Sequence, residues 1–171
     1  MTLRKRLSKL LNGLYLIIVV FFLMDAISSF EIKSQEIKSF CYLGLILLSP
    51  LVLTNTILRK INWKKKLATI LLPIVSIIGI LTIGPLEFLF SSAAWQTQTI
   101  HYQNIHSANK KIEYQMQDVG ALGRNQRMVE VHYLTKLFMI VQPVEKDINP
   151  GPEWKKVDIE VNEAEMDIKL K

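Results

Sequence analysis

Long, nearly uninterrupted apolar blocks dominate the first half of the chain. They run over residues 10–27, 40–58 and 67–87, and nine of the eleven residues in the segment 14–24 are Leu, Ile, Val or Phe. At a rise of about 1.5 Å per residue, a helix of about 18 residues is roughly 27 Å long, close to the roughly 30 Å of a bilayer's hydrocarbon core. The pattern therefore predicts three membrane-spanning helices.

Proline and glycine modify two of these predicted helices. Pro50 lies inside the second block, where it removes one backbone donor and predicts a kink. Gly84-Pro85 predicts a helix end or a sharp bend in the third block. The aromatic segment 88–90 that follows is expected to lie at the outer membrane interface.

From residue 95 onward the pattern changes to an alternation of apolar and polar residues. In the segment 112–117, apolar residues at even positions alternate with Glu113, Gln115 and Gln117. This predicts a strand whose apolar face is dry and whose three polar side chains face water. Further segments are strand-like, with breaks at 120–125 and 149–152: they are 99–102, 128–141, 157–161 and 166–170.

The two patterns together predict a membrane α+β protein. A three-helix transmembrane region is expected over residues 1–94, with a cytoplasmic loop at 59–66, followed by a small antiparallel β-rich domain over residues 95–171. Five or six short strands in a sheet or sandwich are expected. The single cysteine, Cys41, lies in an apolar block, so this small domain has no disulfide and only a marginal core. We therefore expect it to gain stability from the helices, a second copy or a partner.

The positive charge of the chain is confined to short segments beside the apolar blocks. The formal net charge is +6, yet residues from Trp95 to the end carry ten basic and eleven acidic side chains. A nucleic-acid-binding domain would need a basic face on its folded part. The charge distribution therefore argues against a nucleic-acid partner and for the lipid bilayer.

The orientation follows from the basic residues in the short loops. The tail 1–9 carries four and the loop 59–66 carries five, whereas the loop 28–39 carries two that are offset by two glutamates. Nine against two places the N-terminus in the cytoplasm and the β-rich domain outside, as in a multi-pass protein of the cell (inner) membrane. A cleaved signal peptide is the alternative interpretation of the first block, and it gives the same orientation. Expected membrane-interface anchors are Trp63, Lys64, Lys65, Lys66 and Trp95.

Two sets of residues are candidates for function. Asp25 and Glu87 are the acidic residues nearest the ends of the spans, and both are expected at the outer boundary of the membrane, where they could bind a cation or pass a proton. The second set is apolar on both faces of a strand and is interpreted as a buried central strand or, alternatively, as an interaction surface: Leu137, Phe138, Met139 and Ile140.

Motifs of catalysis, metal binding or cofactor binding are not evident. The three histidines have neither the number nor the spacing of zinc ligands. The glycines and arginines of the segment 120–127 lack the lysine and the strand-to-helix context of a phosphate-binding loop, so a hairpin turn is the better interpretation. No catalytic residue, metal or cofactor is therefore predicted.

These observations favour a non-enzymatic role. The leading hypothesis is a small membrane accessory or interaction protein, whose external β-domain contacts an envelope protein, a peptide, a cell-wall component or a second copy of the chain. The competing hypothesis is an oligomeric transport or channel subunit that uses Asp25 and Glu87. Three spans are few for a transporter built from repeats, so this role would require oligomers. A membrane enzyme whose active site carries no recognised motif is a third hypothesis.

Overall fold

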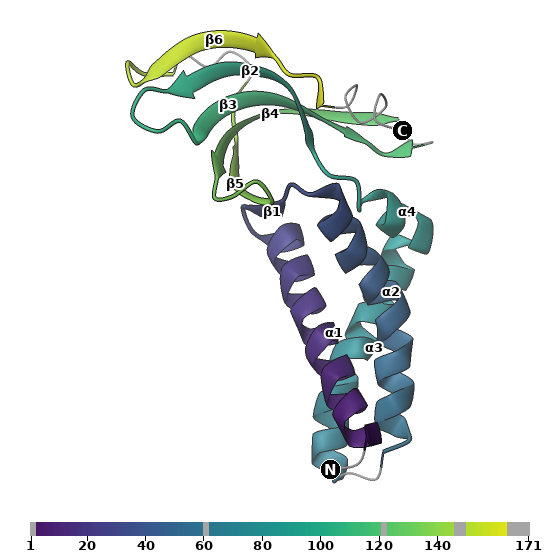
Figure 1. The fold of residues 1–171 in the computed structure, drawn as a ribbon. Helices are drawn as coiled ribbons and strands as arrows, with labels where there is room; N and C mark the ends of the chain where they lie inside the picture. Colours follow the sequence, from purple (N-terminus) through teal and green to yellow (C-terminus); the bar gives the residue numbers. More distant parts are fainter. Residues whose placement is uncertain (1–2, 60–61, 121–122, 146–149, 164–171) are drawn as a thin grey trace. The chain divides into compact units, whose positions relative to one another are not determined.

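The computed structural model describes residues 3–59, 62–120, 123–145 and 150–163 (Figure 1). The chain forms two compact units. One, here called the helix unit, consists of Met1–Leu23 and Ser39–Ser92, and the other, the sheet unit, consists of Met24–Lys38 and Ala93–Lys171. The short segment between the first two long helices thus belongs with the C-terminal half of the chain.

Three long apolar helices confirm the helices predicted from the apolar blocks, while their placement in a membrane stays a prediction. They are α1 (Leu3–Ile27), α2 (Gln35–Ile57) and α3 (Trp63–Ile83), and each is long and apolar enough to cross a membrane. The third helix begins before residue 67, because the Asn62 side chain accepts a hydrogen bond from the Lys64 backbone N–H and caps the helix.

Gly84 and Pro85 end the third helix as predicted. Gly84 has a φ of 97°, and its N–H donates to the Ile80 carbonyl oxygen. Most side chains would be strained at such a positive φ, so glycine suits this position. Pro85 then begins the short helix α4 (Pro85–Phe90), where the missing N–H of proline costs nothing.

Polar side chains join the three long helices of the helix unit. The Tyr15 hydroxyl of α1 lies 3.1 Å from the Ser49 hydroxyl of α2 and donates to the Ser76 hydroxyl of α3 at 2.9 Å. Close by in the sequence of α1, Phe22 packs against the rings of Tyr42 and Phe88. Phe88, expected at the interface, is buried. Hydrogen bonds between helices are a common means of association inside a bilayer.

The sheet unit contains a six-stranded antiparallel sheet in the order β1-β5-β4-β3-β2-β6 (Figure 1). This agrees with the predicted number of strands and their antiparallel pairing. The strands are β1 (Phe30–Ile32), β2 (Gln96–Asn104), β3 (Lys110–Asp118), β4 (Arg124–Tyr133), β5 (Phe138–Pro143) and β6 (Trp154–Glu160).

Two features of the sheet differ from the expectation. The strand-like run 128–141 is not one strand, because the backbone turns between β4 and β5, where the Leu134 N–H donates to the Phe138 carbonyl oxygen. The second feature is β1, which comes from the segment between α1 and α2 and pairs with β5. The strand predicted at 166–170 lies outside the described residues.

The dry and wet faces of β3 also differ from the prediction. The apolar core of the sheet consists of Val129, Val131, Met139 and Val141 from β4 and β5. On β3, however, the expected wet face is buried: the exposed fractions of Glu113, Gln115 and Gln117 are 1%, 0% and 7%. Buried polar side chains need hydrogen-bond partners, and these partners define the candidate site.

Candidate functional site

A cluster of five polar residues lies around the buried carboxylate of β3. Its members come from five separate parts of the sheet unit and are here called the polar cluster: Lys33, Thr97, Glu113, Tyr133 and Glu163. Thr97 and Glu113 lie on neighbouring paired strands, and Tyr133 ends β4, the next strand of the sheet. Antiparallel pairing thus brings together residues that are far apart in the sequence.

Glu113 accepts all of its hydrogen bonds through one oxygen. Its Oε2 accepts from the hydroxyls of Thr97 and Tyr133, each at 2.8 Å. The Nε2 amide of Gln115 donates to the same oxygen at 3.2 Å. The other oxygen, Oε1, is buried and has no hydrogen-bond partner in the part of the chain that the structure describes. A buried acceptor without a donor costs free energy, so the hydrogen-bonding capacity of the Glu113 carboxylate is only partly satisfied.

Lys33 is the cation of the polar cluster. Its Nζ lies 3.0 Å from both carboxylate oxygens of Glu163 and donates to the hydroxyls of Thr97 at 3.1 Å and Tyr133 at 3.2 Å. The side chains of Lys33 and Glu163 are largely but not fully buried, so solvent screens this ion pair only in part. The Thr97 backbone N–H also donates to Glu163, at 2.8 Å. Lys33 and Glu163 therefore hold the start of β2 and the segment after β1 together.

The Tyr133 phenol serves as a hydrogen-bond donor in this cluster. Burial raises the pKa of Tyr133 far above its usual value of 10, and the neighbouring Glu113 carboxylate raises it further. The phenol consequently keeps its proton and donates a hydrogen bond to Glu113, while its oxygen accepts a hydrogen bond from the Lys33 ammonium. Because the phenol stays protonated, the cluster does not supply a phenolate nucleophile.

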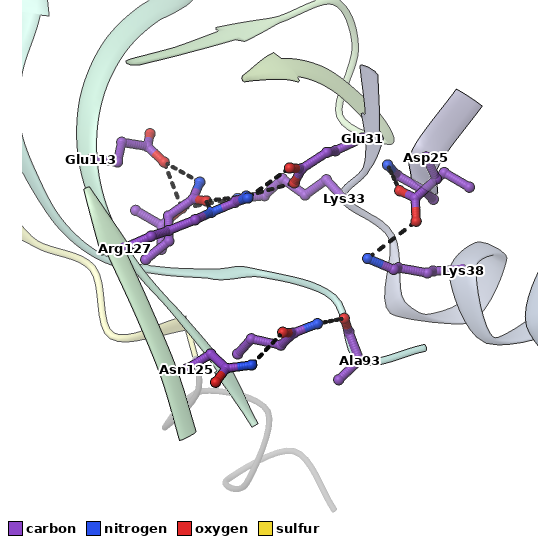
Figure 2. A network of polar contacts seen from close by, with 12 residues as sticks. Asp25, Glu31, Lys33, Lys38, Ala93, Glu113, Asn125 and Arg127 are labelled. Carbon is purple, nitrogen blue, oxygen red and sulfur yellow. Dashed lines mark hydrogen bonds and ion pairs between the residues drawn. The ribbon is translucent and has the colours of Figure 1, made fainter. Parts of the chain in front are cut away.

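A second network centres on Arg127, and Figure 2 shows it together with Lys33 and Glu113 of the polar cluster. The Arg127 guanidinium forms two hydrogen bonds with the Glu31 carboxylate, at 2.7 and 2.5 Å, and two with the Gln115 Oε1, at 3.1 and 2.8 Å. It also stacks over the Trp95 ring, with its carbon 3.9 Å from the ring centre. Such two-pronged pairs are among the strongest side-chain hydrogen bonds. Arg127 therefore joins β4 to β1.

Gln117 continues the row of buried polar side chains toward the end of β3. Its amide donates to the Ala93 carbonyl oxygen at 2.8 Å and accepts from the Asn125 amide at 3.2 Å (Figure 2). The three polar residues of this strand face are therefore all engaged. They position the backbone at the start of β2 and the side chains of β4.

A pocket of about 480 Å³ opens beside the polar cluster. All five cluster residues contribute to its wall, together with two further lysines, Lys111 and Lys136. Its apolar wall comes from Ile100, Ala108, Leu134 and Val161. A concave apolar surface with a few converging polar groups is typical of a binding site for a small ligand or a short segment of chain.

The structure places the candidate acids in different units. Asp25, in the sheet unit, is buried, accepts the Ile32 backbone N–H at 2.8 Å and lies 3.3 Å from the Lys38 ammonium (Figure 2). These contacts fix the segment that leads into and out of β1. Glu87, in the helix unit, is exposed in the first turn of α4.

The apolar candidates of β5 lie within the sheet. Met139 is fully buried between β1 and β4, and Phe138 stacks on Phe30 with a ring separation of 5.3 Å. Leu137 is partly exposed in the turn before the strand. The middle of this run therefore packs inside the sheet.

The expected membrane-interface anchors have different surroundings. Trp63 is exposed at the start of α3, directly before the three lysines 64–66. Trp95 belongs to the sheet unit, where it lies under Arg127 and packs on the apolar core. The environment of Trp95 accounts for its aromatic character without a membrane.

Sequence reasoning missed the polar cluster. In the sequence, Glu31, Lys33 and Lys38 stand out only as charges of a short loop, although all three form ion pairs in the sheet unit. The sequence of β3 contained a signal, because a polar residue at every second position is also compatible with a buried face whose side chains hydrogen-bond to polar groups of other strands. Periodicity alone does not distinguish that face from one in water.

Neither the described residues nor the comparisons point to a known chemistry. Within the described ranges, no three His, Cys, Asp or Glu residues are grouped so that they could hold a metal ion. His101 instead pairs with Asp158, at 2.9 Å. Comparisons of the chain with protein-family models, with curated proteins and with solved structures found no match.

Proposed function

We propose that the chain is an integral protein of the cell (inner) membrane that carries an external binding module. In this proposal α1, α2 and α3 span the bilayer, the N-terminus is cytoplasmic, and the sheet unit lies on the extracytoplasmic side. The sheet unit contacts an envelope protein, a peptide or cell-wall component, or a second copy of the chain. The protein acts as an accessory or interaction protein.

The surface of the helices supports membrane insertion. Only 22%, 33% and 11% of the residues in the most apolar windows of the three helices are buried within the protein. In water, such large exposed apolar patches would drive association. In hydrocarbon the same side chains are solvated, and the hydrogen bonds of Tyr15 join the helices from within.

The pairing of β1 with β5 is the observation on which the topology depends. Phe30 pairs with Ile140, and Ile32 pairs with Phe138, so the segment between α1 and α2 forms one sheet with the C-terminal half. Both segments must therefore be on the same side of any membrane that the helices cross. Three spans give this result, because two spans separate the segments; two or four spans before the sheet would not.

The basic residues support the direction of insertion. The segment 28–39 has only two lysines, and in the structure Lys33 pairs with Glu163 and Lys38 pairs with Asp25. Their charges are thus compensated within the sheet unit. The tail 1–9 and the loop 59–66 carry nine basic residues and no acidic ones. The positive-inside rule then favours the cytoplasm for the tail and that loop.

A pull-down of the full chain in mild detergent tests the binding role. We expect a stoichiometric protein or cell-wall partner to copurify with the wild type. Lys33→Met, in the polar cluster, should release it, whereas Lys156→Met, on the exposed strand β6, should retain it. A discrete homo-oligomer that conducts ions in liposomes would instead contradict the proposal and support the transport alternative.

A further inference from the structure

The charges around the pocket beside the polar cluster are unevenly compensated. Within the pocket lining, the Lys33 ammonium is paired with the Glu163 carboxylate, and Glu113 Oε2 accepts three hydrogen bonds. These groups largely satisfy one another. Any ligand must therefore be recognised mainly by the groups that they leave over.

Two ammonium groups are left over on the wall. The Lys111 Nζ lies 5.5 Å from the centre of the Tyr133 ring, and Lys136 is exposed in the turn after β4. In the described part of the chain, neither ammonium lies within ion-pair distance of a carboxylate. The pocket lining contains three lysines and two glutamates, so its formal net charge is +1, and this favours an anionic group on the ligand.

One acceptor is also left over. Glu113 Oε1 has no hydrogen-bond partner among the described residues, although the side chain is only 1% exposed. A buried carboxylate oxygen without a donor is unfavourable, and each such atom calls for an explanation. Because Glu113 lines the pocket, a ligand that brings an N–H group to its carboxylate would supply the missing donor.

The remaining wall is apolar and the space is small. Ile100, Leu134 and Val161 give the pocket an apolar side, and its volume is about 480 Å³. This is room for a few small amino-acid residues and lies at the lower end of the range for ligand pockets. An apolar side chain would bury its surface against this wall.

We propose that this pocket binds a carboxylate that bears a neighbouring N–H donor and a small apolar side chain, as at the C-terminus of a short peptide. The carboxylate pairs with Lys111 and Lys136, the N–H donates toward Glu113, and the side chain lies against Ile100 and Val161. A free amino acid has the same chemistry and is the other source. The inference rests on the binding role proposed above and names the ligand class.

Titration of the full-length protein in detergent tests the pocket, with binding followed by calorimetry. The probes are the dipeptide Ala-Ala, its C-terminal amide, free alanine and inorganic phosphate. We expect Ala-Ala to bind and the amide to bind at least about tenfold more weakly, as for the loss of one charge-assisted hydrogen bond. If free alanine binds with the same affinity as Ala-Ala, the site is assigned to amino acids. If free alanine binds more weakly than Ala-Ala, the site is assigned to peptide C-termini.

Variants link the binding to the named residues. Lys111→Met should weaken Ala-Ala binding by at least about tenfold, Lys111→Arg should restore part of it, and Lys155→Met, on the exposed strand β6, should leave it unchanged. Glu113→Gln should weaken binding of the dipeptide while the unfolding temperature shows that the variant is folded.

Several outcomes would overturn the inference. One is that no probe binds to the folded wild type at roughly 10 mM, a concentration above the range of specific ligands. The others are equal binding of Ala-Ala and its amide, stronger binding of phosphate than of Ala-Ala, and unchanged binding of Ala-Ala by Lys111→Met. The titration measures only the binding of small ligands to the pocket. Its failure would therefore contradict neither the proposed topology nor a partner found in the pull-down. A reversed topology would likewise leave the titration valid.

Discussion

The helix unit and the sheet unit depart in different ways from the pattern expected of a protein core in water. In the helix unit, large apolar side chains such as Leu71 and Leu81 are more than half exposed. In the sheet unit, Glu113 and Gln115 are among the most buried side chains. Both units also bury apolar side chains, such as Ile18 and Val131, but the helix unit leaves much of its apolar surface uncovered and the sheet unit encloses polar side chains.

The difference shows that burial depends on the surrounding solvent and on the available partners. An apolar helix surface is stable when hydrocarbon replaces water, so its side chains need no protein core. A polar strand face is stable when donors and acceptors from other strands meet it, as Arg127 and Tyr133 do here. The exposed apolar surface of the helix unit therefore indicates a hydrocarbon environment, and the buried polar side chains of the sheet unit indicate a candidate binding site.

The largest effect is expected at the buried ion pair of the sheet unit. Lys38→Met removes the ammonium beside Asp25, whose side chain is 1% exposed. Losing one partner of a buried pair costs about 3–5 kcal/mol of unfolding free energy. The double variant Asp25→Leu/Lys38→Met should regain at least half of this loss. Denaturant unfolding in detergent measures both, and a single variant as stable as the wild type would contradict the role of the pair.

A charge in the middle of α3 is expected to have the next largest effect. Leu71→Lys should make insertion of this helix less favourable by about 2.5–3.5 kcal/mol, because an ammonium at the centre of a bilayer is costly. Leu67 has the same exposed fraction, 61%, but lies in the second turn of α3. Leu67→Lys should therefore insert almost normally, since its ammonium reaches the interface. Extraction of membranes with alkaline carbonate compares them, and equal retention of the two variants would argue against a membrane-spanning α3.

A smaller effect is expected from one hydroxyl of the polar cluster. Tyr133→Phe removes a donor to Glu113 Oε2 and should lower the unfolding free energy by about 1–3 kcal/mol. Tyr114, on the opposite face of β3, is a matched control, and Tyr114→Phe should change stability little. Thermal unfolding in detergent decides between them. Equal losses in the two variants would show that the buried cluster is no more important than the outer face.

The smallest effect is expected at the exposed edge strand β6. Hydrogen bonds from His101 and Lys156 lower the pKa of Asp158 below 3.8, and Asp158 raises the pKa of Lys156 above 10.5. The lowered pKa of Asp158 gives a contribution to stability that is present above about pH 4, and this contribution is lost as the pH falls through the folded-state pKa. The raised pKa of Lys156 gives a contribution that is present below about pH 10 and is lost as the pH rises through the folded-state pKa.

Asp158→Asn should remove this small contribution between those pH values. Because Asp158 and Lys156 are solvent-exposed and His101 is partly exposed, we expect an unfolding temperature within error of the wild type at neutral pH. A scan of unfolding temperature against pH checks this expectation. A large loss at neutral pH would mean that the edge strand is more important to the fold than its exposure indicates.

The sequence predicted the broad architecture because each pattern there has one dominant cause. Continuous apolar blocks of about twenty residues indicate spanning helices, and Gly84-Pro85 ends a helix in almost any context. The strands near Ile112 and Val157 followed from alternation. The turn that divides the run 128–141 was not predicted, because its residues 134–137 include no glycine or proline to mark it.

The polar cluster was not predictable because it depends on long-range pairing. Lys33 and Glu163 are 130 residues apart in the sequence, and Arg127 and Glu31 are 96 apart. Nothing local to Lys33 indicates that it follows a short strand paired with β5. The prediction that Glu113 faces water was wrong for the same reason, since its partners come from other strands.

Cysteine labelling in intact cells tests the topology most directly. The single native cysteine, Cys41, is replaced by Ser, and one new cysteine is introduced at Lys155 in the sheet unit or at Lys64 before α3. A membrane-impermeant maleimide should label Lys155→Cys in intact, wall-stripped cells and Lys64→Cys only after the cells are permeabilised. The opposite pattern, or equal labelling of both positions before permeabilisation, would contradict the account.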